Sequence, residues 1–264
     1  TFSASSRTTP SFMSIFTSLY PTDHGVLTTL ASDKQDRPMV AINYEIRTLP
    51  QILKNHGYKT YAMATSNQLS PELGFGRGFD EFEIGTNYKK ERRDFLALLP
   101  QLKAEKFFIF FHDIEPHDPY IPPFPYYSYY DPSPFGKSLV ENFNANASDI
   151  GRLDIRDADS LYVKSEKIRK HWEEYSGLFW SEVDGNNPLH ISALISLYDG
   201  EIKYLDEFIG RLQGVLEENN LLENTIIIFT ADHGEAFYEH GKFTHIQVYN
   251  EVLKVPFILR APSA

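Results

Sequence analysis

The sequence predicts a layered α/β fold in which helices cover both faces of a mostly parallel sheet. Four short apolar runs bounded by turn residues have the length of buried strands, and they lie at residues 60–64, 107–112, 225–230 and 255–259. Segments with helical spacing alternate with these runs, and the order helix, turn, strand recurs along the chain. We therefore expect all four runs to be strands of a parallel sheet.

Two helices are expected to flank these strands. Between residues 191 and 218, apolar residues recur at helical spacing with charged residues between them, which predicts a long helix along one face of the sheet. A second helix over residues 46–55 is expected to stop at Gly57, because glycine commonly follows the last turn of a helix.

Residues 124–190 differ in character from the rest of the chain. They begin with a cluster of tyrosines at 126–130, continue through a stretch rich in Pro, Asn, Asp and Ser, and contain a helix candidate near residues 161–175. We predict an excursion from the sheet within a single domain over residues 1–264. The excursion either shapes a substrate entrance or is a solvated insertion without a role.

Composition excludes several classes of function. The 264 residues are 42% hydrophobic, enough for a sizeable core, and the net charge of −11 disfavours nucleic acid or an anionic membrane surface as a partner. The lack of cysteine excludes disulfide scaffolds, Cys-ligated zinc and a Cys nucleophile, and it is compatible with reducing and oxidising compartments alike. The longest apolar stretches are far shorter than the roughly 20 residues of a membrane span. We therefore expect no nucleic-acid partner and no membrane span in this chain.

A hydroxyl-rich segment at residues 7–16 is the first site candidate. Pro10 suits the first helical position, so Thr9 is expected as the N-cap and Thr8 just outside the helix. This arrangement places a hydroxyl beside free backbone donors at the positive end of the helix dipole, a natural seat for an anion. The alternative is an ordinary helix start without a ligand.

The second candidate is the segment at residues 229–235, which follows a predicted strand. Asp232 and His233 stand side by side there, before a glycine that lets the backbone turn sharply. An aspartate and a histidine are a usual beginning of a metal site. Three further basic residues follow closely and contact a ligand or substrate, or else belong to a solvated loop; they are His240, Lys242 and His245.

A third candidate lies at residues 112–120, after another strongly apolar run. Prolines on both sides of His117 and Asp118 restrict the loop, which helps to aim a side chain. Its place at the carboxyl end of a predicted strand matches that of Asp232 and His233. His117 is therefore either a site residue or a structural histidine.

These three segments, in this order, resemble the sulfatase branch of the alkaline phosphatase superfamily. Residues 8–11 are similar to the family's nucleophile motif, and residues 19–26 are similar to the helix behind it. Further similar blocks lie at residues 48–60, 77–80, 116–120, 224–235 and 239–245. Each block is short, but the ordered set extends over most of the chain.

The resemblance implies an alkaline phosphatase-like three-layer α/β/α sandwich. In the family, a first strand carries acidic metal ligands and a C-terminal subdomain follows the core; both are expected to lie outside residues 1–264. The chain is therefore expected to be a core portion of a longer protein.

The resemblance also assigns the nucleophile to Thr8. Sulfatases of the main type oxidise a Cys or Ser at this position to formylglycine, which Thr cannot become, and Phe12 stands where the motif has Arg. Both departures point to relatives with a Thr nucleophile, which act on phosphate monoesters or diesters or transfer phosphoglycerol and phosphoethanolamine groups. We expect a metal-dependent hydrolase or transferase acting on a phosphate ester or, as second choice, a sulfate ester. The alternative is a non-catalytic or incomplete domain that binds an anionic ligand.

A divalent metal ion is the expected cofactor. A Thr hydroxyl is a poor nucleophile at neutral pH, and an ion held by Asp232, His233 and Thr8 would lower its pKa. An imidazole ligand favours Zn²⁺ or Mn²⁺, with Ca²⁺ or Mg²⁺ as alternatives.

The same analogy assigns four basic residues to the substrate, a small-molecule, glycan or lipid-headgroup ester that carries negative charge. Contacts with its anionic oxygens or leaving group are expected from His117, Lys242 and His245. A second metal or a substrate oxygen is expected at His240.

Overall fold

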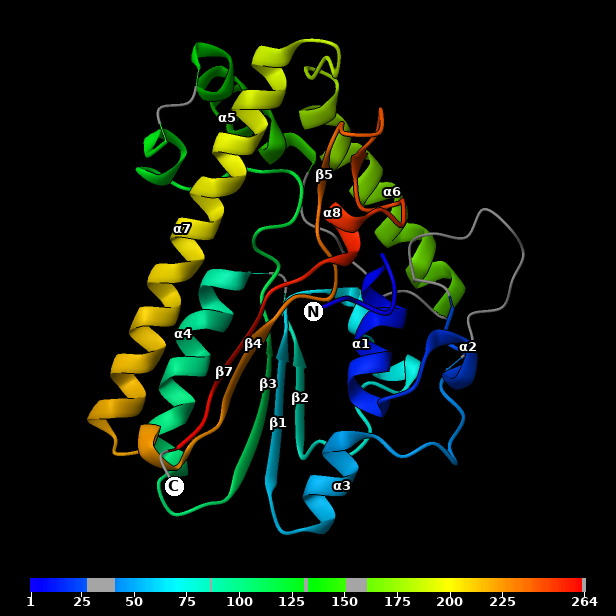
Figure 1. Cartoon of the computed structure of the whole chain (residues 1–264), viewed down its shortest axis with the longest axis vertical. Helices are drawn as coiled ribbons and strands as arrows, with labels where there is room; N and C mark the ends of the chain where they lie inside the picture. The colour runs from blue at the N-terminus through cyan, green and yellow to red at the C-terminus, as the bar shows by residue number, and fades with distance from the viewer. Residues whose placement is uncertain (28–40, 86, 131–132, 151–160, 263–264) are drawn as a thin grey trace. The chain divides into compact units, whose positions relative to one another are not determined.

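The structure is a computed structural model that describes residues 1–27, 41–85, 87–130, 133–150 and 161–262 (Figure 1). The chain forms two compact units. The first unit comprises residues 1–114, 210–234 and 245–264, and the second unit comprises residues 115–209 and 235–244. The second unit therefore contains all of the described residues of the predicted excursion at 124–190. Among the described residues, no helix is long and apolar enough to cross a membrane.

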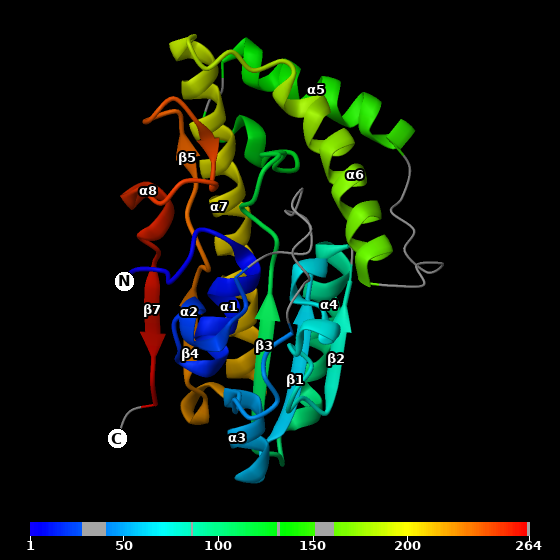
Figure 2. The same ribbon diagram turned by 90° about the vertical axis from the view of Figure 1, so that its right-hand side faces the viewer.

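A three-stranded parallel sheet forms the centre of the first unit. Its strands are β1 (Lys59–Ala64), β2 (Glu81–Ile84) and β3 (Phe107–His112), in the order β2-β1-β3. Ala64 pairs with Ile84 on one side and with His112 on the other, so the three strands end at the same edge (Figure 2). The predicted strands at 60–64 and 107–112 are therefore confirmed.

Alternation along β3 explains why helices cover both faces of this sheet. Successive side chains of a strand point to opposite faces. The Phe110 ring packs edge-on against Phe12 of α1, 5.4 Å away, whereas the neighbouring Phe111 ring stacks on Phe95 of α4 at 4.5 Å. The two views show α1 and α3 on one side of the sheet and α4 on the other (Figures 1 and 2). The first unit therefore has the predicted three layers.

The helices of the first unit begin and end as follows. The α-helices are α1 (Thr8–Thr17), α2 (Pro21–His24), α3 (Leu49–Asn55), α4 (Tyr88–Leu98) and α8 (Asn250–Leu253). Short 3₁₀ helices are η1 (Asn67–Leu69), η2 (Pro71–Leu73), η3 (Leu99–Leu102) and η6 (Leu222–Asn224). The helix predicted at 46–55 starts three residues later, because Thr48 caps it in a capping box with Gln51.

The runs at 225–230 and 255–259 form strands, but the expectation that they belong to the parallel sheet is wrong, because they pair with each other in a separate two-stranded antiparallel sheet. β7 (Phe257–Arg260) pairs antiparallel with β4 (Ile227–Thr230), with Ile228 opposite Leu259. Parallel strands need a long crossover that is usually helical, and residues 231–256 form only short elements. The ladder starts two residues later than predicted because Pro256 has no N–H to donate.

The start of α1 also differs from the prediction. Arg7 is the N-cap, Thr8 is the first helical residue, and Pro10 is the third. Proline is tolerated here because the first N–H groups of a helix have no intrahelical acceptor in any case. The first backbone bond of the helix runs from Ser11 N to Arg7 O at 3.1 Å. Thr8 therefore stays at the helix N-terminus, within the first turn.

The second unit is mainly helical. Its elements are α5 (Pro134–Asn146), α6 (Leu161–Trp180), the first part of α7 (Pro188–Glu218), η4 (Tyr126–Ser128), η5 (Ala147–Ile150), and the pair β5 (Ala236–Phe237) and β6 (Phe243–Thr244). The predicted helix at 191–218 is confirmed, and the candidate near 161–175 extends to Trp180. Its core gathers apolar side chains of the helices around the fully buried Tyr120.

Buried His24 connects α1 and α2 of the first unit. Its Nδ1 accepts a hydrogen bond from Val26 N at 3.1 Å, so its Nε2 carries the proton and donates to Ser14 Oγ at 3.1 Å. Burial lowers the pKa of His24 below its ordinary value of 6.5. The folded protein therefore holds this imidazole in its neutral form.

We predict that His24 makes the protein less stable in acid. Below pH 6.5 the unfolded chain takes up a proton at His24 that the folded chain resists, so the free energy of unfolding falls as the pH drops toward the lowered pKa. Urea unfolding between about pH 5 and pH 7.5 measures this slope. The slope should become smaller in His24→Gln, and the matched control is His56→Gln, which alters an exposed histidine at the end of α3. Equal slopes in wild type and His24→Gln would contradict the prediction.

Candidate active site

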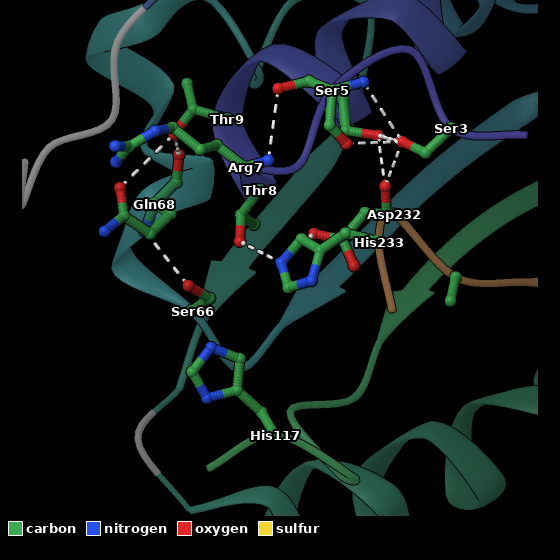
Figure 3. A network of polar contacts seen from close by, with 12 residues as sticks. Ser3, Ser5, Arg7, Thr8, Thr9, Ser66, Gln68, His117, Asp232 and His233 are labelled. Carbon is green, nitrogen blue, oxygen red and sulfur yellow. Dashed lines mark hydrogen bonds and ion pairs between the residues drawn. The ribbon is translucent and has the colours of Figure 1, made fainter. Parts of the chain in front are cut away.

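Thr8 and His233 meet in the first unit. Thr8 Oγ1 lies 3.3 Å from His233 Nε2, although the two residues are separated by most of the chain (Figure 3). Thr8 starts α1, and His233 lies three residues beyond the end of β4. In Figure 2 the arrow of β7 points opposite to those of β1 and β3, so its antiparallel partner β4 runs in the same direction as they do. The two side chains therefore meet beyond the carboxyl end of β4, and α/β proteins bind ligands outside the carboxyl ends of their strands.

Asp232 completes a group of three oxygen and nitrogen donors. Its Oδ2 lies 3.4 Å from His233 Nε2. His233 Nδ1 lies 3.1 Å from the carbonyl oxygen of Gly234, which can only accept, so Nδ1 carries the proton and Nε2 carries the lone pair. A lone pair and a carboxylate oxygen thus face each other, which is favourable only with a cation or a proton between them.

These atoms fit a divalent metal ion. In tetrahedral coordination with bonds of about 2.0–2.1 Å, two ligand atoms lie about 3.3 Å apart. Both distances from His233 Nε2, 3.3 Å to Thr8 Oγ1 and 3.4 Å to Asp232 Oδ2, match this separation. A neutral imidazole, a carboxylate and a hydroxyl are a donor set for Zn²⁺ or Mn²⁺. His245 stacks on the His233 ring with centroids 4.0 Å apart.

Serine hydroxyls hold the backbone of Asp232. Ser11 Oγ donates to the carbonyl oxygen of Asp232 at 2.6 Å, and Ser3 Oγ contacts both this oxygen and Ser11 Oγ (Figure 3). Thr9, the residue after Thr8 in α1, is fully buried. Its Oγ1 donates to the carbonyl oxygen of Gln68 at 3.0 Å. The first turn of α1 is therefore bonded both to the segment after β4 and to η1, which follows β1.

Gly234 holds the same segment from the other side. Its N–H donates to Val252 O at 2.6 Å, and a Cβ built on it would lie 2.2 Å from the carbonyl oxygen of Glu251. Only glycine allows this close approach of two backbones.

The second unit contains a polar group around His117. A metal-ligand atom from each of His117, Asp118 and Glu235 lies within 4.8 Å of the others. Asp118 and Glu235 are buried, and buried carboxylates require hydrogen bonds or a counter-charge. Tyr120 donates from its hydroxyl to Glu235 Oε2 at 3.1 Å, and burial, followed by the Glu235 charge, raises the pKa of Tyr120, so the phenol remains protonated. This spacing could also accommodate a divalent cation.

His240 and Lys242 lie on the turn that joins β5 to β6. Both are exposed, and Gly241 between them has a φ of 71°, in the left-handed region that favours glycine. The structure thus gathers Thr8, Asp232, His233 and His245 in the first unit. The roles assigned to His117, His240 and Lys242, which belong to the second unit, stay predictions.

Sequence reasoning missed the residues that support the site. Ser11 was visible only as part of a helix start, because nothing local shows that its hydroxyl bonds to residue 232. The partners of Asp118 on α6, Ser176 and Trp180, are separated by four positions, a spacing that many helices show.

The sulfatase family model matches residues 1–264, so the chain belongs to the sulfatase family. Among curated proteins, N-acetylglucosamine-6-O-sulfatase of Bacteroides thetaiotaomicron is 42% identical over 67 residues, which is 25% of this chain and 12% of that protein. The multifunctional alkaline phosphatase superfamily protein PehA of Trinickia caryophylli is 25% identical over 172 residues, covering 62% of this chain and 30% of PehA. The chain thus spans well under half the length of these relatives.

Solved structures share the fold. The phosphonate monoester hydrolase SpPMH from Silicibacter pomeroyi superposes with a TM-score of 0.71 at 19% identity, covering 99% of this chain and 60% of that one. A protein solved in complex with its substrate D-glucosamine-2-N,6-O-disulfate gives a TM-score of 0.62 at 20% identity, covering 99% and 63%. The alkaline phosphatase-like α/β fold expected from the sequence is therefore confirmed.

We predict that Gly234→Ala disturbs the site. The added methyl group would collide with the Glu251 carbonyl, and overpacking of this kind costs about 1–3 kcal/mol in the free energy of unfolding. Gly214→Ala, in an open position on α7, is the matched control and should be neutral or slightly stabilising. Urea unfolding of both variants measures the difference. A Gly234→Ala variant with an unchanged free energy of unfolding would show that the close approach of the two backbones imposes no constraint.

Proposed function

We propose that this chain carries the catalytic core of a metal-dependent ester hydrolase or transferase, with Thr8 as nucleophile. The observation that supports this proposal most directly is the distance of 3.3 Å between Thr8 Oγ1 and His233 Nε2, beside Asp232. Membership of the sulfatase family and the fold of the phosphonate monoester hydrolase support hydrolysis of a sulfate or phosphate ester. The metalloenzyme character of that family supports a bound ion.

Asp232, His233 and Thr8 would hold the divalent ion, with Zn²⁺ or Mn²⁺ preferred. When bound, the ion lowers the pKa of the Thr8 hydroxyl and offsets negative charge on the transferred group. His233 would bind the ion through the lone pair of Nε2, because its Nδ1–H donates a hydrogen bond to the carbonyl oxygen of Gly234. Asp232 contributes a carboxylate whose backbone Ser11 fixes.

The reaction proceeds in two displacements. Thr8 Oγ releases its proton to solvent water and attacks the phosphorus or sulfur of the ester; the bond from that atom to the alcohol oxygen breaks, and the alcohol leaves after this oxygen takes up a proton. The Thr8 ester formed in this way is then cleaved by water in a hydrolase, or by an acceptor hydroxyl in a transferase, which restores the free hydroxyl. His117, Lys242 and His245 are proposed to contact the anionic oxygens or the leaving group, to which one of them supplies a proton, and His240 is proposed to hold a second metal or a substrate oxygen.

The substrate is proposed to be a phosphate monoester or diester, with a sulfate ester as the second choice. Phe12, at the position of the family motif's Arg, packs its ring against Phe110 and His112 at 5.4 and 5.2 Å and brings no charge to the site. A Thr nucleophile with this substitution differs from a formylglycine sulfatase. The ester group belongs to a small molecule, a glycan or a lipid headgroup.

We predict that Thr8→Ala abolishes turnover. Loss of the nucleophile should lower kcat by at least about 10³-fold, equivalent to roughly 4 kcal/mol, whereas Thr8→Ser keeps a hydroxyl and measurable activity. Thr17→Ala, at the other end of α1, is the matched control and should retain activity. The assay uses p-nitrophenyl phosphate, bis-p-nitrophenyl phosphate and p-nitrophenyl sulfate with added Zn²⁺ or Mn²⁺. Activity of Thr8→Ala near wild type would contradict the assignment, and wild-type protein inactive on all three esters with metal bound would favour a non-catalytic anion-binding domain.

A further inference from the structure

Helix α6 of the second unit carries a stripe of three residues that faces His117 and Asp118. The three are Trp172, Ser176 and Trp180, spaced by four positions and therefore on one side of the helix. Trp180 Nε1 donates to Asp118 Oδ2 at 3.0 Å, and Ser176 Oγ donates to the same oxygen at 3.2 Å. The Trp172 ring lies edge-on to the His117 imidazole, with centroids 5.4 Å apart.

The two carboxylate oxygens of Asp118 have different partners. Oδ2 is held by α6, whereas Oδ1 lies 3.3 Å from His117 Nδ1. The Asp118 side chain is only 5% exposed, and among the described residues of the second unit no lysine or arginine forms an ion pair with it. Burying a carboxylate costs free energy unless hydrogen bonds or a charge compensate for it. Here the compensation comes from α6 on one side and His117 on the other.

His117 is thereby given a defined orientation. Its Nδ1 lies 2.8 Å from the backbone oxygen of Asp118 as well as 3.3 Å from Oδ1, and both oxygens only accept. Nδ1 therefore carries the proton, and the lone pair belongs to Nε2. The His117 side chain is 20% exposed, so part of the ring remains accessible to a ligand.

We infer that Asp118, held by Ser176 and Trp180 of α6, is a positioning residue that fixes the tautomer and ring orientation of His117. In this arrangement Nε2 of His117 is the atom that contacts the substrate: in the imidazolium form it donates Nε2–H to an anionic oxygen or to the leaving alcohol, while Nδ1–H stays on Asp118. The catalytic role of His117 rests on the proposed function, whereas the tautomer and orientation of its ring do not. The helical part of residues 124–190 then contributes to the active enzyme instead of being a solvated insertion.

A bound cation is the competing role for the same atoms. His117, Asp118 and Glu235 are close enough to hold one. The positioning role is favoured because it uses the hydrogen bonds of His117 and Asp118 as the structure has them, with Nδ1–H as donor. A metal ion held by His117 and Asp118 would instead overturn the inference.

The test reads the tautomer of His117 directly. In protein labelled with ¹⁵N-histidine, long-range ¹H–¹⁵N spectra at about pH 8, where imidazoles are mostly neutral, distinguish a protonated Nδ1 from a protonated Nε2. Wild type should show His117 protonated at Nδ1. Asp118→Asn keeps the size of the side chain and the backbone acceptor but removes the charge, so the share of the tautomer protonated at Nε2 should rise. His171, on the same helix without a contact to Asp118, is the internal control.

Kinetics supply the second readout. In Asp118→Asn, the loss of the carboxylate that orients His117 should lower kcat by about 10–100-fold with little change in KM. Trp180→Phe and Ser176→Ala each remove one hydrogen bond to Asp118 and should produce smaller losses. Ser176→Thr, which keeps the hydroxyl, should restore wild-type behaviour, and Trp172→Phe, which alters no bond to Asp118, should leave the tautomer unchanged.

Two results would overturn the inference. One is an unchanged His117 tautomer in Asp118→Asn. The other is a Zn²⁺ titration in which His117 resonances shift in wild type and no longer shift in Asp118→Asn, which would make both residues metal ligands. Because the tautomer is read without turnover, an inactive protein leaves this test intact, so failure of the proposed function and failure of this inference are distinguishable.

Discussion

The hydrogen bond from Ser11 Oγ to the backbone oxygen of Asp232 is the contact on which the candidate site depends. It joins the first turn of α1 to the segment that follows β4, two parts of the chain separated by 221 positions. Since Thr8 lies one turn before Ser11, and His233 directly follows Asp232, the same bond brings their side chains together. Gly234, bonded to Val252 on the other side, prevents this segment from moving away.

Aromatic packing fixes the other end of the same helix. Phe12 and Phe16 both pack edge-on against Phe110 of β3, at 5.4 and 4.8 Å. The position that carries Arg in the family motif thus anchors α1 to the sheet. The helix is held by apolar contacts along its length and by hydroxyl bonds at its start, so the nucleophile candidate is positioned by the fold itself. The loss of one cation at Phe12 gives greater weight to the basic residues proposed to contact the substrate.

Much of this was visible in the sequence. Continuous apolar runs located β1, β3 and β4, and the polar pair after β4 indicated a ligand site beyond the carboxyl end of that strand. The direction of β7 was not visible, since direction depends on what lies between two strands and residues 231–256 have no clear helical pattern. The start of α1 was misplaced because proline is equally tolerated at several positions of a first turn. The contacts of Ser11 with residue 232, and of Trp180 with Asp118, connect distant segments that carry no local signal.

Metal binding tests the central claim most directly, because the opposed lone pair of His233 and carboxylate of Asp232 require a positive charge between them. Isothermal titration of the full chain with Zn²⁺ or Mn²⁺ should show one ion bound per chain at this site. The affinity should fall by at least about tenfold in Asp232→Asn and in His233→Gln, while circular dichroism shows that both variants remain folded. Binding of equal strength in wild type and both variants, or no binding by wild type at millimolar metal, would contradict the account.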